Sequence, residues 1–223
     1  MPFGVDEAGK GPALGSMFAA AVHLEEPAVL PDGIADSKRL SPSRRDALAE
    51  TIREDDRISV GVAEVPPERI DDPETDMNSL TVRAHAAAIE DALADVSTDG
   101  PVAGLCDACD TDADRFARRV ADACGPFEGE GALEVDARHG ADDDSPLVGA
   151  ASIVAKVERD AHVATIADEY GDVGSGYPGD STTREFLSEY VAEHGELPPF
   201  ARSSWSTCEE LLAEARQTDL GQF

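Results

Sequence analysis

The stretch Gly4-Val-Asp-Glu-Ala-Gly-Lys-Gly-Pro12 joins two apolar segments near the start of the 223-residue chain. These segments, residues 1–5 and 17–24, have the composition of buried β-strands. Asp6 and Glu7 directly follow the first of them. Because neighbouring strand residues point to opposite faces, both carboxylates can serve one site only if the strand ends or curls there. The glycines that follow would allow such a bend.

The same glycines could also indicate a nucleotide-binding loop. Gly9, Gly11 and Gly15 approach the dinucleotide fingerprint, but the third glycine is one place late and an apolar strand follows where a helix is required. A P-loop would need Ser or Thr directly after Gly-Lys, and Gly11 stands there. What remains is a carboxylate pair followed by a cation, Lys10, and by glycine backbone that can approach a phosphate or a sugar closely.

The rest of the chain alternates strands with helices. Further strands are expected near residues 58–62, 102–106 and 132–135, and helices near 41–54, 76–94, 112–124, 146–170, 182–193 and 206–216. This order predicts an α/β sheet domain over residues 1–170 and a helical C-terminal part over residues 171–223.

The charge balance is strongly acidic, with 47 Asp and Glu against 18 Lys and Arg and a formal net charge of -29. Because the acids are interleaved with apolar segments, we expect a folded protein with an acidic surface, as in a halophile, rather than a disordered chain. At molar salt the Debye length is only ~3 Å, so the repulsion becomes tolerable. Lysine occurs only three times, at positions 10, 38 and 156.

Targeting signals and membrane segments are not recognised in the sequence. It shows no signal peptide, lipidation motif or apolar run of about 18 residues. We therefore expect a cytoplasmic protein that does not enter a membrane.

Six segments, in order along the chain, resemble those of the ribonuclease HII family, the type-two ribonucleases H. They are Gly4–Pro12, Asp36–Ser41, Leu105–Asp110, Ala150–Asp160, Gly174–Pro178 and Pro199–Trp205. The last two are similar to the archaeal branch of the family. The resemblance implies a ribonuclease H-like fold, with a mixed sheet flanked by helices.

The resemblance also implies a site of four carboxylates, Asp6, Glu7, Asp107 and Asp142. The register of Asp142 is set by counting back from Pro146, and a slip to a neighbouring aspartate is the alternative. Oxygen ligands without His or Cys suit Mg²⁺ or Mn²⁺. Two such ions ~4 Å apart could activate a water and stabilise the leaving 3′ oxygen.

No histidine is needed in this scheme, because the metals would supply the activated water. We expect all five histidines to be structural or surface residues, namely His23, His85, His139, His162 and His194. Only His139, which lies near Asp142 in the sequence, is kept open as a site residue.

Substrate recognition is a further implication of the resemblance. Gly9-Lys10-Gly11 would read the 2′-hydroxyl through backbone groups, which is how a protein distinguishes RNA from DNA. Tyr177 would stack on the sugar at the RNA–DNA junction. Lys10 stands where many family members have the more planar Arg, which leaves the stringency of junction recognition open.

Phosphate contacts are expected from Lys38 and Lys156, together with Arg202, and Ser152 is expected to contact the substrate. All three lysines lie in the matched segments. Nucleic-acid affinity usually depends on broad basic surfaces and counterion release, which a chain of this charge cannot provide. We therefore expect a small cationic patch around the metals.

The resemblance to the ribonuclease HII family implies an endonuclease that hydrolyses the RNA strand of RNA–DNA hybrids. It would also cut on the 5′ side of ribonucleotides embedded in duplex DNA, leaving a 3′-hydroxyl and a 5′-phosphate, and would act as a monomer. One alternative is a related metal-dependent nuclease on the same fold. The other is an inactive, acidic nucleic-acid-binding protein.

Overall fold

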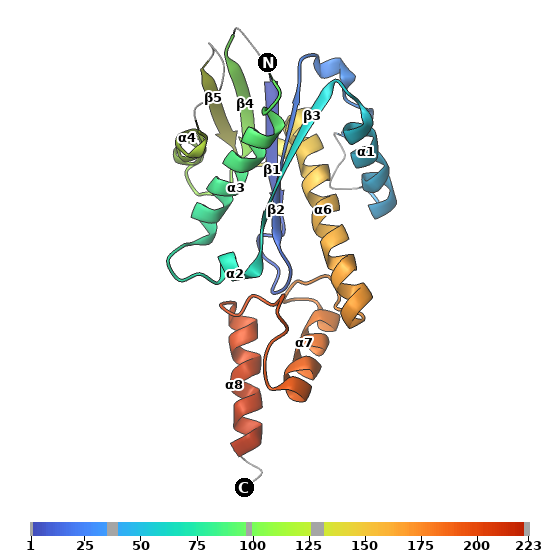
Figure 1. The fold of residues 1–223 in the computed structure, drawn as a ribbon, viewed down its shortest axis with the longest axis vertical. Coiled ribbons are helices and arrows are strands. Elements are labelled where there is room, and N and C mark those ends of the chain that lie inside the picture. The colour runs from blue at the N-terminus through green and yellow to red at the C-terminus, as the bar shows by residue number, and fades with distance from the viewer. Residues whose placement is uncertain (1, 35–39, 97–99, 126–131, 221–223) are drawn as a thin grey trace. The chain divides into compact units, whose positions relative to one another are not determined.

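The computed structural model describes residues 2–34, 40–96, 100–125 and 132–220 (Figure 1). Its strands are β1 Pro2–Ala8, β2 Met17–Leu24, β3 Ile58–Val65, β4 Val102–Asp107 and β5 Leu133–Arg138. Its helices are η1 Pro27–Val29, α1 Pro42–Glu54, α2 Pro67–Ile70, α3 Met77–Ala92, α4 Ala113–Ala123, α5 Ala141–Asp144, α6 Pro146–Tyr170, α7 Ser181–His194 and α8 Ser206–Leu220. Every strand and long helix expected from the sequence is present, and the short helices η1, α2 and α5 were not expected.

The chain forms two compact units, whose segments alternate along the sequence. The sheet unit comprises Met1–Ala8, Phe18–Glu64 and Met77–Glu158, and the helical unit comprises Gly9–Met17, Val65–Asp76 and Arg159–Phe223. Helix α6 therefore contributes residues to both units. The domain boundary expected at residue 170 stays a prediction.

The sheet unit contains a five-stranded sheet in the order β3-β2-β1-β4-β5. Strand β1 pairs antiparallel with β2 and parallel with β4, and β4 pairs parallel with β5. This mixed sheet with flanking helices confirms the predicted fold class.

Strand β1 is longer than the sequence indicated, and this changes the environment of the acid pair. Its ladder with β2 runs from Phe3↔His23 to Ala8↔Phe18, so Asp6 and Glu7 lie inside the strand. The strand therefore ends one residue after the pair, at Ala8, and not directly before Asp6. Because strand side chains alternate, the two carboxylates point to opposite faces of the sheet.

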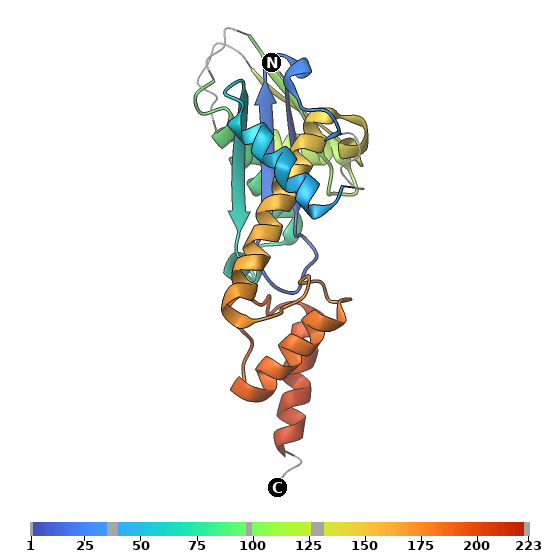
Figure 2. The same ribbon diagram turned by 90° about the vertical axis from the view of Figure 1, so that its right-hand side faces the viewer.

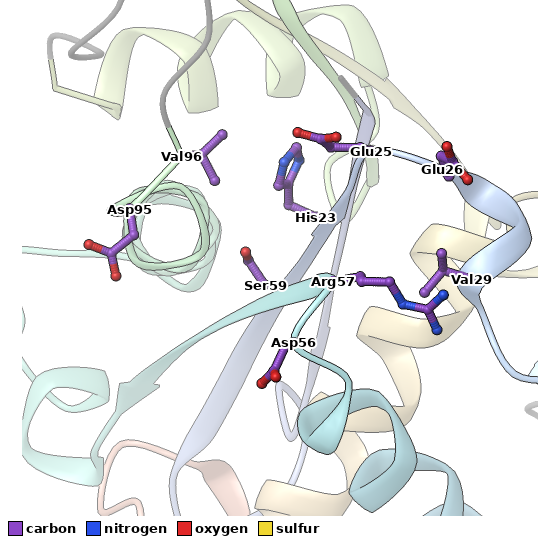
Figure 3. A pocket seen from close by; sticks show the side chains of 9 residues that line it. All are labelled: His23, Glu25, Glu26, Val29, Asp56, Arg57, Ser59, Asp95 and Val96. Atoms are coloured by element: carbon purple, nitrogen blue, oxygen red, sulfur yellow. The ribbon is translucent and has the colours of Figure 1, made fainter.

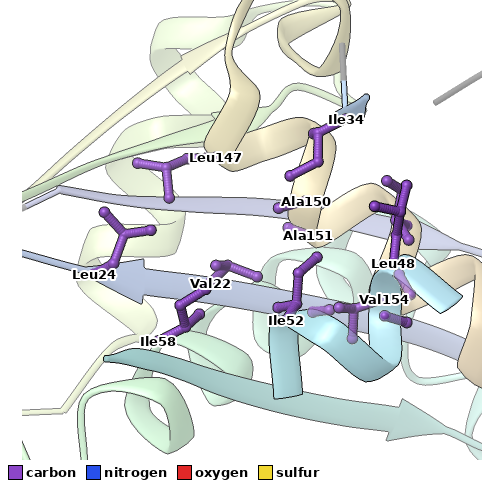
Figure 4. Close-up of a cluster of buried hydrophobic side chains, with 14 residues drawn as sticks. Val22, Leu24, Ile34, Leu48, Ile52, Ile58, Leu147, Ala150, Ala151 and Val154 are labelled. Atoms are coloured by element: carbon purple, nitrogen blue, oxygen red, sulfur yellow. The ribbon is translucent and has the colours of Figure 1, made fainter. Parts of the chain in front are cut away.

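Helix α1 and the first part of α6 cover one face of the sheet, as Figure 2 shows. Their apolar side chains pack on those of β2 in one buried cluster, which includes Val22, Leu48, Ile52 and Val154 (Figure 4). Removing this much apolar surface from water is the main stabilising term of such a layer. Helix α1 begins within one residue of its expected start, with Ser41 accepting a capping hydrogen bond from the Arg44 amide and Pro42 in the first turn.

Helix α3 packs against β1 and against α4, which in turn packs on β5. The approach of α3 to the sheet needs a glycine on β3, because a Cβ at Gly61 would lie 2.1 Å from the carbonyl oxygen of Ala88. A second close approach brings α6 onto β1, since a Cβ at Gly4 would lie 2.4 Å from the backbone of Leu147 and Val148. These contacts hold α3 and α6 beside the strand that carries the acid pair.

The helical unit has its own buried apolar clusters. Helices α7 and α8 pack together through Leu187, Cys208 and Leu211, with Ala13 and Ala201 in the same cluster. The segment after β1 is tied to this core by a bridge between Leu14 and Ala201. Within the described parts of the chain, no helix is long and apolar enough to cross a membrane.

Candidate active site

The predicted acids of the sheet unit lie at one edge of the sheet. Asp6 and Glu7 are near the C-terminal end of β1, Asp107 ends β4, and Asp142 lies in the short helix α5 that follows β5. Because β1, β4 and β5 are parallel, their C-terminal ends meet at the same edge. Ligands of open α/β sheets bind at this edge.

Asp6 faces helix α6. Its side chain is hydrogen-bonded to Ser152, and Ser152 in turn accepts a hydrogen bond from the ammonium group of Lys156, one helical turn further on. Burial and the neighbouring charge of Glu7 raise the pKa of Asp6 to about 8, although Ser152 and Lys156 act in the opposite direction. A bound cation would favour the ionised form of this carboxyl group.

Glu7 faces the opposite side of the sheet, toward α3. Its Oε2 lies 2.8 Å from Nε2 of His85, a residue whose side chain is fully buried. The sequence pattern did not indicate this histidine as part of the site. The available signal was its place in the alanine-rich, buried face of α3, since a buried polar group there needs a partner outside the helix.

Asp107 links the end of strand β4 to the start of helix α5. Its Oδ1 accepts a hydrogen bond of 2.8 Å from the amide of Ala141, the first residue of α5. Burial raises the pKa of Asp107, and the charges of Asp142 and Glu7 raise it further. The hydrogen bond therefore places the start of α5, and with it Asp142, close to the end of β4.

Asp142 differs from its two acidic neighbours in its environment. Asp142 is 5% exposed, whereas Asp143 and Asp144 are exposed. A buried carboxylate beside Asp107 is poised for a ligand, while exposed acids are ordinary solvated charges. This difference supports Asp142 as the fourth acid. His139 contacts the backbone instead, with Nδ1 3.1 Å from the carbonyl oxygen of Ala108.

In the helical unit, Arg202 supports the Gly9-Lys10-Gly11 segment through hydrogen bonds to its backbone. Its guanidinium donates to the carbonyl oxygens of Gly9 at 2.6 Å, Lys10 at 3.0 Å and Gly15 at 2.9 Å. Trp205 adds a hydrogen bond of 3.3 Å to the Gly11 carbonyl. Arg202 is fully buried, so it serves here to fix the loop backbone. The phosphate contact predicted for Arg202 stays a prediction, and this burial speaks against it.

Tyr177 lies beside the same loop. A Cβ at Gly11 would lie 3.7 Å from Cε1 of Tyr177, and the Arg159 guanidinium is 5.3 Å from the centre of the tyrosine ring. The ring is 40% exposed, which is unusual for a large apolar side chain. It is therefore available for stacking on a ligand.

The turn that presents Tyr177 is held by hydrogen bonds. The amide of Gly176 donates to Thr183 at 2.9 Å, and Asp180 accepts from both the amide and the hydroxyl of Ser175. Gly176 has a φ of 84°, a backbone conformation that favours glycine. The Gly-Ser-Gly-Tyr-Pro segment is thus built to fix the position of one exposed aromatic ring.

Comparison with known proteins decides the family. The family model described as Ribonuclease HII matches residues 3–208. The chain is 59% identical to a ribonuclease HII of Haloarcula marismortui over 223 residues, which is 100% of both chains. The chain belongs to the ribonuclease HII family.

Other members of the ribonuclease HII family agree with this in sequence and in structure. A ribonuclease HII of Halobacterium salinarum is 59% identical, with 99% of each chain covered. The ribonuclease H2 of Pyrococcus horikoshii has a TM-score of 0.85 at 32% identity, covering 97% of this chain and 99% of that one. A ribonuclease HII of Archaeoglobus fulgidus, solved in complex with PCNA, has a TM-score of 0.80 at 36% identity, with 95% and 96% covered.

As a ribonuclease HII, the chain is a metal-dependent endonuclease that acts on the RNA of RNA–DNA hybrids. The site fits a metal by the chemistry of its donors, four carboxylates, because burial and then repulsion from the neighbouring acids raise the pKa of Asp6 and Asp107. Among the described residues, no three acidic, histidine or cysteine side chains are close enough to hold an ion alone. Mg²⁺ commonly uses one or two carboxylates together with waters and substrate phosphates, so waters can complete the coordination of an ion here before a substrate binds.

The structure brings the predicted residues of this ribonuclease HII together in two groups. Asp6, Glu7, Asp107 and Asp142 lie in the sheet unit with Ser152 and Lys156, and Gly9, Lys10, Gly11, Tyr177 and Arg202 lie in the helical unit. Ser152 is fully buried, and its observed partners are Asp6 and Lys156. Lys38 lies outside the described residues.

A pocket of about 570 Å³ in the sheet unit lies away from the acids (Figure 3). Its lining includes His23, which pairs with Phe3 at the N-terminal end of β1, whereas Asp6 and Glu7 lie near the other end of that strand. The four acidic side chains in its wall, Glu25, Glu26, Asp56 and Asp95, would repel a polyanion. This pocket is therefore unsuited to the nucleic-acid substrate.

Proposed function

We propose that Asp6, Glu7, Asp107 and Asp142 are the metal ligands of this ribonuclease HII and that the ion is Mg²⁺ or Mn²⁺. The observation that carries the proposal is that these acids gather where three parallel strands end. Burial and the charge of the neighbouring acids raise the pKa of two of the acids, Asp6 and Asp107. A chain gains nothing in stability from burying such a group without a cation. The bound ions would activate the attacking water and stabilise the leaving 3′ oxygen.

Hydrogen bonds within the sheet unit hold the proposed ligands in place. Ser152 and Lys156 orient Asp6 through a hydrogen-bonded chain, and Asp107 anchors the start of α5, which carries Asp142. Lys156 would also offer its charge to a substrate phosphate, as would Lys38. Lys156 would thereby supply positive charge beside the acids of an otherwise acidic protein.

Substrate selection is proposed for the helical unit. The Gly9-Lys10-Gly11 backbone, held by Arg202, would read the 2′-hydroxyl, and the exposed ring of Tyr177 would stack on the sugar at the junction. Cleavage would fall on the 5′ side of a ribonucleotide, in hybrids and in duplex DNA, and would leave a 3′-hydroxyl and a 5′-phosphate. Action as a monomer and a cytoplasmic location belong to the same proposal.

The test is cleavage mapping on a DNA duplex that contains one ribonucleotide, with Mg²⁺ or Mn²⁺, at molar KCl. We expect a single cut 5′ of the ribonucleotide and near-total loss of turnover in Asp6→Asn. Cleavage of plain DNA without ribonucleotide selectivity would favour a related nuclease. Activity unchanged by Asp6→Asn would remove the proposed role of the carboxylates.

The relative solved with PCNA suggests a protein partner. We propose that this chain also binds the sliding clamp of its own cell, on the strength of the 36% identity to the Archaeoglobus fulgidus protein in that complex. Co-elution of the chain with the purified clamp at molar KCl would support this. Separate elution at concentrations of both proteins on the order of 10 µM would contradict a stable complex, because at a nanomolar Kd nearly all of the protein would be bound.

A further inference from the structure

His85 is a buried histidine in contact with a proposed metal ligand. It lies in the middle of α3, is fully buried, and its Nε2 is 2.8 Å from Oε2 of Glu7. Its ring packs edge-to-face on Phe116 of α4, with ring centres 5.2 Å apart. Phe116 is itself buried, so the imidazole is restrained both by the Glu7 contact and by the Phe116 ring.

The second ring nitrogen indicates which form of the imidazole is present. Nδ1 is buried and has no hydrogen-bond partner among the described residues. An imidazolium would leave an N–H at Nδ1 buried without an acceptor, which is costly. A neutral ring with the proton on Nε2 leaves only an unused lone pair at Nδ1 and donates its single N–H to Glu7. The contact is thus a directed hydrogen bond to the carboxylate, with no added positive charge.

We propose that His85 is a positioning residue for Glu7: its Nε2–H donates to Oε2 and holds the carboxylate in the orientation that binds the metal. The inference rests on the proposed role of Glu7. A neutral donor suits this task, because a cation at this point would compete with the metal for the carboxylate. Partners of this kind orient metal ligands, and their loss commonly costs roughly 10- to 100-fold in metal affinity or activity.

The two acids of the pair are contacted from opposite faces of the sheet. Asp6 is oriented from one face of the sheet by Ser152 of α6, and Glu7 from the other face by His85 of α3. Each ligand therefore has its own donor on its own helix.

The experiment is Mn²⁺ titration of the substrate-free full chain by calorimetry at molar KCl. The variants are His85→Leu, which removes both ring nitrogens, and His85→Gln, whose amide can donate at about the position of Nε2. We expect His85→Leu to weaken Mn²⁺ binding roughly 10- to 100-fold and His85→Gln to recover most of the affinity. NMR of ¹⁵N-labelled histidine should show His85 protonated at Nε2 and not at Nδ1.

Thr81→Val is the matched control. Thr81 is equally buried on the same helix, and its hydroxyl donates a hydrogen bond of 2.7 Å to the Met77 carbonyl of that helix. This variant should bind Mn²⁺ as the wild type does. Equal affinity of wild type and His85→Leu would overturn the inference, as would an equal loss in Thr81→Val or a failure of His85→Gln to rescue binding. If His85→Leu does not fold, the Gln variant and the NMR result decide alone. Absence of Mn²⁺ binding by the wild type would instead count against the proposed metal site.

Discussion

The carboxyl group of Asp6 is needed for the proposed metal site, but its burial lowers the stability of the metal-free protein. Its pKa of about 8 in the folded chain lies far above the ordinary value of 3.8 because the group is buried and faces Glu7. Between these two pH values the native state holds a proton that the unfolded chain releases. Asp6 therefore makes the metal-free protein less stable as the pH rises through this window.

Replacing Asp6 with Asn should remove this pH dependence. We expect Asp6→Asn to raise the Tm of the metal-free protein at neutral pH, by about 2–4 °C for each kcal/mol recovered, while abolishing turnover. The difference between the two proteins should shrink toward about pH 4, where both carry an uncharged side chain. The measurement is thermal unfolding in EDTA and molar KCl at several pH values. A Tm difference that does not change with pH would contradict the assigned cause.

Gly9 offers a second test at the scale of one residue. It has a φ of +88°, and a Cβ there would lie 2.9 Å from the Ser16 carbonyl oxygen and 3.1 Å from Cγ of Arg159. We expect Gly9→Ala to cost more than the ~1–2 kcal/mol of a left-handed alanine and to reduce discrimination between ribose and deoxyribose. Cleavage rates on matched substrates, with and without the single 2′-hydroxyl, measure the second effect.

Gly171→Ala is the control for this substitution. Gly171 has nearly the same φ, +86°, but nothing lies within 4 Å of a Cβ placed there. It should show the backbone cost alone, with substrate discrimination unchanged. Equal loss of discrimination in both variants would show that general destabilisation, and not the loop, is responsible.

At the scale of elements, the segment 199–205 acts as the support of the loop after β1. Arg202 pairs three loop carbonyls, and burial lowers its pKa to about 10, so the guanidinium is still charged at neutral pH. Arg202→Met should remove the guanidinium donor from these carbonyls, at about 1–3 kcal/mol for each that is left buried and unsatisfied. We expect lower stability in denaturant unfolding and a loss of ribose discrimination.

Arg202→Lys separates charge from geometry. A lysine keeps the charge but lacks the planar fork that reaches several acceptors at once. It should behave more like the methionine variant than like the wild type. Mn²⁺ binding, which is assigned to the other unit, should be unchanged in both variants. Wild-type discrimination in Arg202→Lys would show that charge alone supports the loop.

The helices and strands could be predicted from the sequence because their hydrophobic periodicity and their start and stop residues are local features. Ser41-Pro42 marks the start of α1, and Pro66-Pro67 directly follows the end of β3 at Val65. The end of β1 could not be predicted in this way. The ladder of β1 with β2 pairs the polar residues Asp6 and Glu7 with Ala20 and Ala19, which is a non-local interaction that the apolar pattern of one strand does not contain.

The acids of the candidate site could be named from motifs, but their supports could not. His85 lies 78 positions from Glu7 in the sequence, and Arg202 lies 193 positions from Gly9. Arg202 lies in the matched segment Pro199–Trp205, but neither residue has a spacing that points to its partner. Both are polar residues that the fold buries, and only the fold shows which groups satisfy them.

The whole molecule carries a net charge of -29, which sets the conditions under which it can bind a polyanion. At low salt, repulsion between this charge and the phosphates opposes association, and salt screens it. Most nucleic-acid-binding proteins instead lose affinity as salt displaces them. We therefore expect activity to be maintained or to increase from about 0.1 M to molar KCl. Cleavage rates across a KCl series measure this, and a steep, monotonic loss would contradict it.

The missing side chain of Gly4 has a consequence for anyone who interprets variants of this enzyme. Helix α6 rests on the backbone of β1 at this residue, and a single added methyl group would meet the helix backbone at 2.4 Å. Ser152 and Lys156 lie further along the same helix, so pushing its first turn outward would also move them from Asp6. In a screen for inactive mutants, position 4 would score like a catalytic residue although it contributes no chemical group. Intolerance to substitution near the acids therefore identifies packing positions such as Gly4 as well as the residues that take part in catalysis.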